Sequence, residues 1–183
     1  QGKYGGAGNP PKSPVEGGYA TEYLWKRIWA KDSVLNLLQH FIHEFDVEDD
    51  KGKKTGEVAL IFPRYHQLDS VRRLVSHSLI YGSGQHYLIQ HSAGSGKSNS
   101  IAWLAHQLSV LHGKDDKRVF DSIVVITDRR VLDRQLQRTV RQFEQTSGVV
   151  ENIDTTSRQL KDALEAGKTI IVTTLQKFPV IVD

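Results

Sequence analysis

Two continuous apolar runs in the second half of the chain constrain its fold more than any other feature. They occupy residues 122–127 (SIVVIT) and 169–174 (TIIVTT), and neither alternates like a strand with one solvated face. A strand of this kind needs cover on both faces, which is the situation of a parallel sheet between two layers of helices. Helical periodicity fills the segments around the runs, so the sequence predicts an α/β fold.

Further strands are predicted at residues 58–62 (VALIF) and 86–90 (HYLIQ), each ahead of a segment with helical spacing. In the predicted helices, apolar side chains recur every three or four residues and therefore line one face. The stripes run from Leu68 to Leu79, from Ile101 to Leu111 and from Leu132 to Phe143, and a shorter helix is predicted over residues 158–167. We assign the whole region, residues 58–183, to one α/β domain.

The first 57 residues differ from the rest in composition and pattern. Residues 1–20 hold six glycines and three prolines and have almost nothing to bury, which predicts a flexible linker. Residues 21–57 are predicted to form a helical connector and a loop. The second helix of this connector begins near Asp32, and its apolar face is expected to extend to Phe45. Mixed charge and glycines predict a solvated loop at residues 46–57.

The composition excludes several classes of protein. The chain has no cysteine, which excludes disulfide frameworks and thiolate metal sites and is typical of a reducing intracellular compartment. No apolar run approaches the roughly 18 residues of a membrane span and no signal peptide opens the chain, so we expect a soluble protein without a membrane partner. A net charge of +3 permits a nucleic-acid partner without requiring one. Because the chain contains no methionine and begins at Gln1, we expect an internal piece of a longer polypeptide.

A glycine-rich loop at residues 91–98 (HSAGSGKS) follows one predicted strand and precedes a predicted helix. The pattern G-x-x-x-x-G-K-[ST] binds phosphate because its glycines turn backbone N–H groups toward the oxygens, while the following helix points its positive end at them. His91 stands where that pattern opens with glycine, but the strand before and the helix after match the required context. The alternative is a glycine-rich turn that ends in Gly-Lys-Ser and binds nothing.

This loop supplies the candidate nucleotide-binding residues. Lys97 would reach the β- and γ-phosphates, and the hydroxyl of Ser98 would bind Mg²⁺, so we assign both as catalytic. The complete set of candidates in the loop is His91, Ser92, Ala93, Gly94, Ser95, Gly96, Lys97, Ser98 and Asn99.

Four arginines line one face of a helix predicted in the second half of the chain. Arg130, Arg134, Arg138 and Arg141 follow one another at steps of four, four and three residues. Like charges stacked in this way cost roughly a few tenths of a kcal/mol for each adjacent pair, so a use for them is expected. A phosphate backbone is the obvious partner, because each arginine can neutralise phosphate charge. The alternative is a solvated face with a bias toward arginine.

Four blocks of the sequence, in this order and at this spacing, resemble the superfamily 2 helicase-like motor in the restriction (R) subunit of type I restriction-modification enzymes. They are residues 62–74 (FPRYHQLDSVRRL), 87–105 (YLIQHSAGSGKSNSIAWLA), 121–137 (DSIVVITDRRVLDRQLQ) and 170–178 (IIVTTLQKF). The resemblance covers most of the chain and includes the linker and the helical connector. It implies a RecA-like P-loop fold for residues 58–183, with helices on both faces of a parallel sheet, truncated before the Walker B motif.

The resemblance implies part of an ATP- and Mg²⁺-dependent motor that pulls double-stranded DNA through a site-specific deoxyribonuclease complex. The implied partners are double-stranded DNA and the methyltransferase (M) and specificity (S) subunits, in the cytoplasm of a prokaryotic cell. In such motors a glutamine ahead of the P-loop reads the adenine, and Gln67 fits that place. The alternative is that Gln67 is an ordinary exposed helix residue.

The resemblance also implies where DNA would be contacted. The first block covers Thr127, Asp128, Arg129 and Arg130, to which the next turn adds Arg134, and the second covers Thr173, Thr174 and Gln176. Both blocks follow predicted strands, at the carboxyl edge of an open α/β sheet where ligands gather. Threonines at strand ends are equally explained as β formers.

Two departures from the family limit what the chain is expected to do alone. The 183 residues contain no Asp-Glu-x-His block, which holds Mg²⁺ and the attacking water in this superfamily, and no nuclease core. We therefore expect weak nucleotide binding and neither ATP hydrolysis nor DNA cleavage by the isolated chain. The other interpretations are a different superfamily 2 ATPase that acts on RNA or a nucleoprotein, and a P-loop phosphotransferase for a small metabolite.

Overall fold

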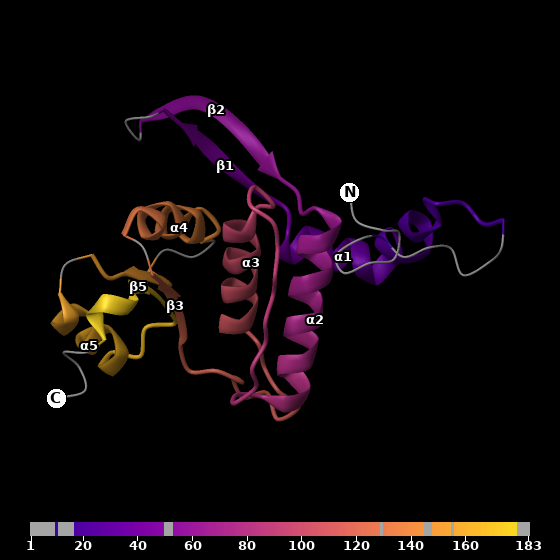
Figure 1. Ribbon diagram of the computed structural model, residues 1–183. Coiled ribbons are helices and arrows are strands. Elements are labelled where there is room, and N and C mark those ends of the chain that lie inside the picture. The colour runs from indigo at the N-terminus through magenta and orange to yellow at the C-terminus, as the bar shows by residue number, and fades with distance from the viewer. Residues whose placement is uncertain are drawn as a thin grey trace. The chain divides into compact units, whose positions relative to one another are not determined.

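The computed structural model describes residue 10 and residues 17–49, 53–128, 130–144, 148–154 and 156–178. The chain divides into two compact units, Gln1–Ser70 and Val71–Asp183, and the boundary falls inside helix α2 (Tyr65–Tyr81). Figure 1 shows the elements of both units. Most of the predicted linker at residues 1–20 lies outside the described residues. No helix in the described ranges is long and apolar enough to cross a membrane.

The first unit contains a helical turn, a short helix and a β-hairpin. Its elements are η1 (Leu24–Ile28), α1 (Lys31–His40), β1 (His43–Glu48) and β2 (Lys54–Ile61), and the two strands pair antiparallel. The prediction that the helix extends to Phe45 is wrong. The N–H groups of Phe41 and Ile42 both bond the carbonyl of Leu37 and turn the chain out of the helix. The residues that follow pair with β2. Their backbone N–H and C=O groups form hydrogen bonds with that strand in place of the hydrogen bonds of a longer helix.

The segment predicted as a solvated loop, residues 46–57, is largely part of this hairpin. Opposite the end of β1 the second strand holds extra residues, and the register shifts there. Gly56 takes a φ of +87°, and Thr55 Oγ1 donates to the carbonyl of Val47 at 2.9 Å, so the irregularity is a bulge within the pairing. Residues 58–61 of the predicted strand at 58–62 form the second half of β2, which pairs with β1 and not with a parallel sheet.

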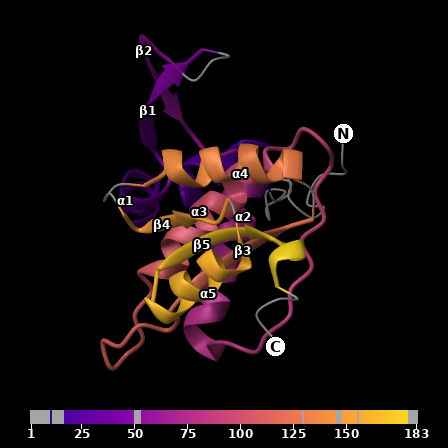
Figure 2. The same cartoon turned by 90° about the vertical axis from the view of Figure 1, so that its left-hand side faces the viewer.

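The second unit is built on a three-stranded parallel sheet with the order β3-β5-β4. Its strands are β3 (Ile123–Thr127), β4 (Val150–Asn152) and β5 (Ile170–Thr174). Helix α4 (Arg130–Gln142) lies over one face and helix α5 (Ser157–Glu165) over the other, as Figures 1 and 2 show. Every residue of β5 is buried, so the predicted parallel α/β arrangement is confirmed. β4 was not predicted, because three residues are too few to show a period.

Two expectations about this sheet are wrong. Residues 86–90 form no strand, and Leu88 within them is 93% exposed. A strand needs a neighbour that takes its backbone hydrogen bonds, and the described sheet gives that segment none. In β3 only Val125 is buried, whereas Val124 and Ile126 are 37% and 49% exposed, because this edge strand has one uncovered face.

The helices α2, α3 (Lys97–Ser109), α4 and α5 confirm the four helical stretches predicted from the apolar spacing. The buried face of α3 nevertheless differs from the predicted leucine stripe. Trp103 is buried, whereas Ile101, the first member of that stripe, is 38% exposed. Trp103 meets Phe143 edge to face with the ring centroids 5.3 Å apart. Packing against the end of α4 therefore decides which face of α3 is buried.

A half-buried contact between α3 and α4 makes the stability of the second unit sensitive to pH. His106 Nε2 lies 2.8 Å from the carbonyl oxygen of Val140. Burial lowers the pKa of the imidazole, although that hydrogen bond and the charge of Glu144 oppose the shift. The unfolded chain thus takes up a proton more readily than the native unit, so stability falls as the pH drops below the usual histidine value of 6.5.

We expect the urea midpoint of the chain to decrease when the pH is lowered from about 7.5 to about 5.5. The decrease should be smaller in His106→Gln, because the glutamine amide can still donate to the Val140 carbonyl but does not titrate. Urea titrations followed by circular dichroism at both pH values measure the difference. An equal decrease in the two proteins would assign the pH dependence to other groups.

Candidate nucleotide and nucleic-acid site

The glycine-rich loop leads directly into α3, whose first residue is Lys97. Gly94 and Gly96 adopt φ values of +71° and +78°, in the left-handed region that favours glycine. A Cβ at Gly94 would meet no atom within 4 Å, so the backbone angle and not crowding requires glycine there. The predicted junction of loop and helix is therefore confirmed, although the strand expected before it is absent.

The side chain of Lys97 folds back over this loop. Its Nζ donates to the carbonyl oxygen of Ser92 at 2.8 Å and to that of His91 at 3.3 Å. The ammonium therefore already lies beside the loop backbone, where a bound anion would meet it. His91 takes part through its carbonyl group, which every residue type has. The replacement of the usual glycine by histidine thus leaves this contact in place.

The first turn of α3 offers backbone donors to the same loop. The N–H groups of Asn99 and Ser100 bond the carbonyl of Gly96, so those of Lys97 and Ser98 precede the helical ladder. The helix dipole adds partial positive charge at this end, and the first turn holds no acidic residue that would repel an anion. These donors fit a triphosphate, and the Ser98 hydroxyl fits the Mg²⁺ that a nucleotide carries. Bound ATP would supply the phosphoanhydride, and the chain would bind and orient it.

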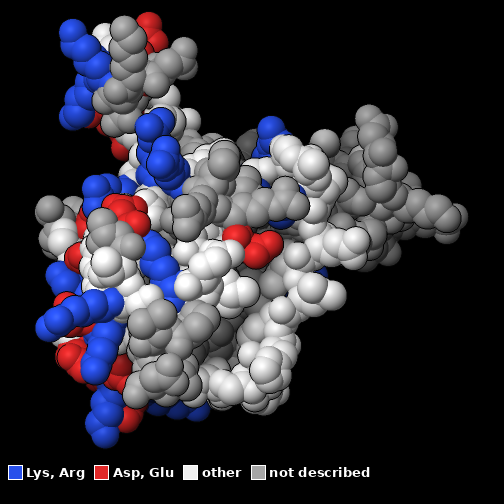
Figure 3. Space-filling model, turned by 60° about the vertical axis from the view of Figure 1, so that its left-hand side comes forward, with Lys and Arg blue, Asp and Glu red and all other residues white. Residues whose placement is uncertain are grey.

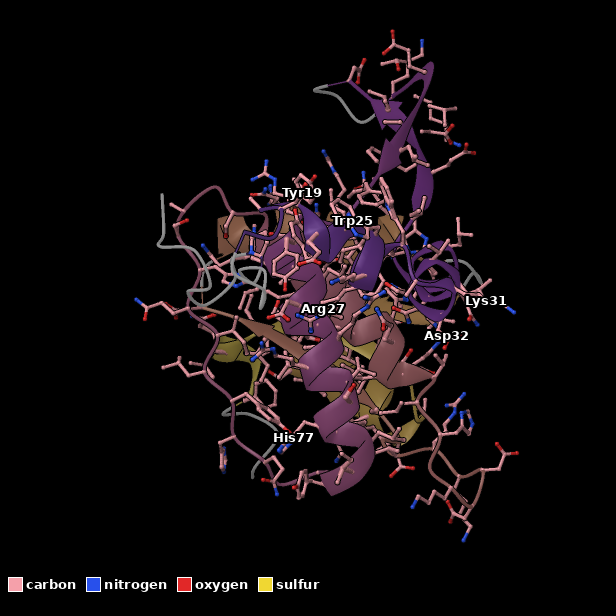
Figure 4. All side chains as sticks on the ribbon, turned by 90° about the vertical axis from the view of Figure 1, so that its right-hand side faces the viewer. Tyr19, Trp25, Arg27, Lys31, Asp32 and His77 are labelled. Carbon is pink, nitrogen blue, oxygen red and sulfur yellow. The ribbon has the colours of Figure 1, made fainter. Side chains whose placement is uncertain are left out.

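An aromatic contact that the sequence did not predict holds the segment ahead of the glycine-rich loop against α2. The hydroxyl of Tyr87 and Nδ1 of His77 are 2.7 Å apart, and the ring of Tyr81 stacks on His77 with the centroids 4.2 Å apart. Figure 4 marks His77 on α2. The contact holds the extended segment to α2 in place of a strand ladder. No local pattern indicated it, because Tyr87 lies within the run that resembles a strand.

Gln67, the candidate reader of adenine, belongs to the first unit. It is only 3% exposed, so the alternative of an ordinary exposed helix residue is wrong. Its Oε1 accepts the N–H of Arg64 at 2.9 Å, which is one half of a capping box at the start of α2. Gln67 therefore has a structural role, and its role in adenine recognition stays a prediction.

The two predicted DNA-contact blocks meet at the carboxyl ends of β3 and β5, where Thr127 and Thr174 are register partners. Gln176 reaches across this edge and donates from Nε2 to the carbonyl of Asp128 at 3.0 Å. Thr173 and Thr174 are 0% and 4% exposed, which leaves Asp128 and Gln176 as exposed side chains of the edge. A direct DNA contact by either buried threonine would need the edge to open.

The arginine-rich face of α4 is exposed at Arg134, Arg138 and Arg141. The opposite face, which packs on the sheet and on α3, is buried. Arg129 lies outside the described residues, and so does the side chain of Arg130. Figure 3 shows acidic side chains among the basic ones on the part of the surface that it displays. Arg134, Arg138 and Arg141 therefore form an exposed stripe along α4.

A family profile described as SWI2/SNF2 ATPase matches residues 66–181, which is more than half of the chain. No curated protein and no solved structure matches the chain significantly. The matched region begins in α2 and includes the P-loop, the arginine face and both strand ends. It is a superfamily 2 helicase-like region on an α/β fold of the RecA-like P-loop type. The chain belongs to the SWI2/SNF2 ATPase family.

Proposed function

We propose that this chain is the ATP-binding half of the DNA translocase motor in the restriction (R) subunit of a type I restriction enzyme. The observation that carries the proposal is the P-loop, where left-handed glycines, an ammonium beside the backbone and a helix N-terminus converge. Membership of the SWI2/SNF2 ATPase family supports the coarser part, a superfamily 2 nucleic-acid ATPase motor. The four sequence blocks support the finer part, the type I R subunit.

Lys97 and Ser98 have the central roles at the nucleotide. The ammonium of Lys97 neutralises charge on the β- and γ-phosphates. To do so, it gives up its hydrogen bonds to the carbonyl oxygens of His91 and Ser92 and donates to phosphate oxygens instead. The Ser98 hydroxyl binds the Mg²⁺ of the nucleotide. Backbone N–H groups from the loop and the first turn of α3 hold the remaining phosphate oxygens. These residues bind and orient ATP without forming a covalent bond to it.

Double-stranded DNA lies, in this proposal, along the carboxyl edge of the sheet and the arginine face of α4. The helix begins three residues after β3 ends, so the stripe from Arg134 to Arg141 starts close in sequence to the edge that holds Asp128. No ion pair among the described residues involves Arg134, Arg138 or Arg141. Duplex DNA presents one negative charge for about every 1.7 Å of its axis and would offset their mutual repulsion.

The complete enzyme would be an ATP-dependent, site-specific deoxyribonuclease of the prokaryotic cytoplasm. Its M and S subunits would hold the recognition site while the R subunit moves and cuts the DNA. The second candidate is another superfamily 2 motor that remodels a nucleoprotein, and membership of the SWI2/SNF2 ATPase family supports this motor as much as the first. A metabolite phosphotransferase has no support from that match.

The test uses the full-length subunit that contains this chain, assembled with its M and S subunits. With MgATP the complex is expected to move along duplex DNA and displace an oligonucleotide bound ahead of it. Arg134→Gln combined with Arg138→Gln should weaken DNA binding and lower the slope of log affinity against log salt by about 2, because two phosphate contacts are lost. Arg158→Gln, on the exposed surface of α5, is the matched control and should leave the slope unchanged.

The outcomes separate the two candidates. A subunit that assembles with neither M nor S, yet hydrolyses ATP in the presence of DNA or a nucleoprotein, would exclude the type I assignment in favour of the second motor. A salt slope that is unchanged in the double arginine variant would show that DNA does not follow α4.

A further inference from the structure

The first unit leaves more large apolar side chains in solvent than it buries. In its described part it buries Leu37, Phe41 and Leu68, whereas eight large apolar side chains are between 46% and 75% exposed. Single exposed apolar residues are ordinary, but groups of them mark surfaces that another molecule covers. Two such groups are present, one aromatic and one on the hairpin.

The aromatic patch consists of Tyr19, Trp25 and Trp29, which are 75%, 46% and 63% exposed. The rings of Tyr19 and Trp25 meet edge to face with the centroids 6.1 Å apart, and Trp29 follows one turn after Trp25. Figure 4 shows Tyr19 next to Trp25, and Arg27 stands between Trp25 and Trp29 in the sequence. Arg27 and Lys31 form no ion pair within the described residues. The patch is therefore apolar with the cationic side chain of Arg27 in the same helical turn, whereas Lys31 lies beside Asp32 and away from Tyr19 and Trp25.

The hairpin row consists of Val58, Leu60 and Phe62, which are 62%, 61% and 56% exposed. They alternate with less exposed residues and so point to one face of the hairpin. Their neighbours across the ladder are acidic, because Asp46 pairs with Val58 and Glu44 pairs with Leu60. Glu44 is exposed. Asp46 is paired with Lys54 of the same hairpin, so Glu44 is the carboxylate of this rim that forms no ion pair within the described residues.

We propose that two copies of this chain associate, with the aromatic patch of one copy on the hairpin row of the other. The two surfaces are complementary, since each has an apolar centre and Arg27 beside the aromatic patch is opposite in charge to Glu44 beside the hairpin row. A two-fold axis would form the contact twice and cover both surfaces of each copy. The six apolar side chains expose on the order of 700 Å² per copy, close to the roughly 800 Å² that each partner contributes to a standard protein interface.

A single nucleic-acid strand fits the aromatic patch less well than a protein surface does. Lys26 is paired with Glu22, and Asp32 follows Lys31 directly, so little net positive charge remains for phosphates. The edge-to-face geometry of the first two rings also offers no parallel surfaces between which a base could stack. Trp, Tyr and Arg are, by contrast, the residues that dominate protein interfaces.

The test is the oligomeric state of the purified chain, measured by sedimentation velocity over a hundredfold range of concentration. A reversible equilibrium between monomer and dimer is expected. Trp25→Ala combined with Trp29→Ala should raise the Kd of the dimer on the order of a hundredfold, because aromatic anchors dominate such interfaces. Leu35→Ala combined with Leu38→Ala is the matched control and should leave Kd unchanged, since both leucines are exposed on α1 outside the two surfaces.

A charge-swap experiment distinguishes the proposed contact between the aromatic patch and the hairpin row from non-specific association. Arg27→Glu and Glu44→Arg are each expected to raise the Kd of the dimer about tenfold, and the combined variant should recover most of the affinity. A chain that is monomeric throughout the range would overturn the proposal, as would a combined variant that binds no better than either single one. Monomers whose tryptophan fluorescence is quenched by a single-stranded oligonucleotide would assign the patch to nucleic acid instead.

Discussion

Lys97→Ala is expected to lower the affinity of the chain for MgATP by about tenfold to a hundredfold. The ammonium would form charge-assisted hydrogen bonds with phosphate oxygens, and these contribute about 1.5–3 kcal/mol. Its bonds to the carbonyls of Ser92 and His91 place it at the loop before any ligand arrives. Titration with a fluorescent ATP analogue measures the loss. Lys161→Ala, which removes an exposed lysine from α5, is the matched control and should bind normally.

In the proposed complex with M and S subunits, the same substitution should abolish ATP-driven movement along DNA while the subunits still assemble. Normal movement by the Lys97→Ala complex would contradict the assignment of the triphosphate to this loop. Unchanged MgATP affinity in the isolated chain would contradict it independently, without reference to DNA.

Leu160→Ala is expected to reduce the free energy of unfolding of the second unit by about 2–5 kcal/mol. Leu160 is completely buried in a cluster with Ile153, Ala163 and Ile171, and Phe178 packs against this cluster. Truncation would leave a cavity between α5 and β5 that the surrounding side chains fill only in part. Urea denaturation followed by circular dichroism measures the change.

Leu164→Ala provides the comparison, because it makes the same chemical change on the same helix. Leu164 is 39% exposed, so its truncation should cost less than about 1 kcal/mol. The two substitutions change helix propensity equally, and the difference between them reports burial alone. Similar losses in both variants would contradict the packing of α5 on the sheet.

Elements whose chemistry is local could be predicted from the sequence. The run that forms β5 is continuously apolar, and the structure covers it on both faces. The α5 helix ends where expected, with Gly167 at a φ of +63°. The loop-to-helix junction at Lys97 was also predictable, since its glycines, its lysine and the following helix are adjacent in the chain.

Elements that depend on distant partners could not be predicted in the same way. The run at 86–90 has the composition of a strand but pairs with no strand of the described sheet. The charged segment at 46–57 has the composition of a loop, yet most of it belongs to the two strands of the hairpin, β1 and β2, which pair with each other. In α3 the leucine spacing suggested one buried face, but the ring of Phe143 selects the face with Trp103. Tertiary contacts overrode the local pattern in each case.

The residues of the candidate site also divide into those that a local motif predicts and those that depend on distant contacts. Nine of its ten candidate nucleotide-binding residues, 91–99, are consecutive, so a motif could find them as a group, whereas Gln67 lies far ahead of them in the sequence. The sequence predicted that the strand-end residues follow strands at the carboxyl edge of the sheet, but they come together only because β3 and β5 are neighbours, which the register shows. The burial of Thr173 and the capping bond of Gln67 depend on packing and on helix geometry, and no motif encodes them.

The central position of β5 determines how the second unit would loosen. This strand is bonded on both edges and covered on both faces, so its amide hydrogens should be the last of the unit to exchange with heavy water. The carboxyl end of β5, which carries Thr174, is therefore expected to be rigid. If DNA binds at this edge as proposed, its movement would be accommodated by the turns that follow β3 and β5, because β5 itself is bonded on both edges and buried along its length.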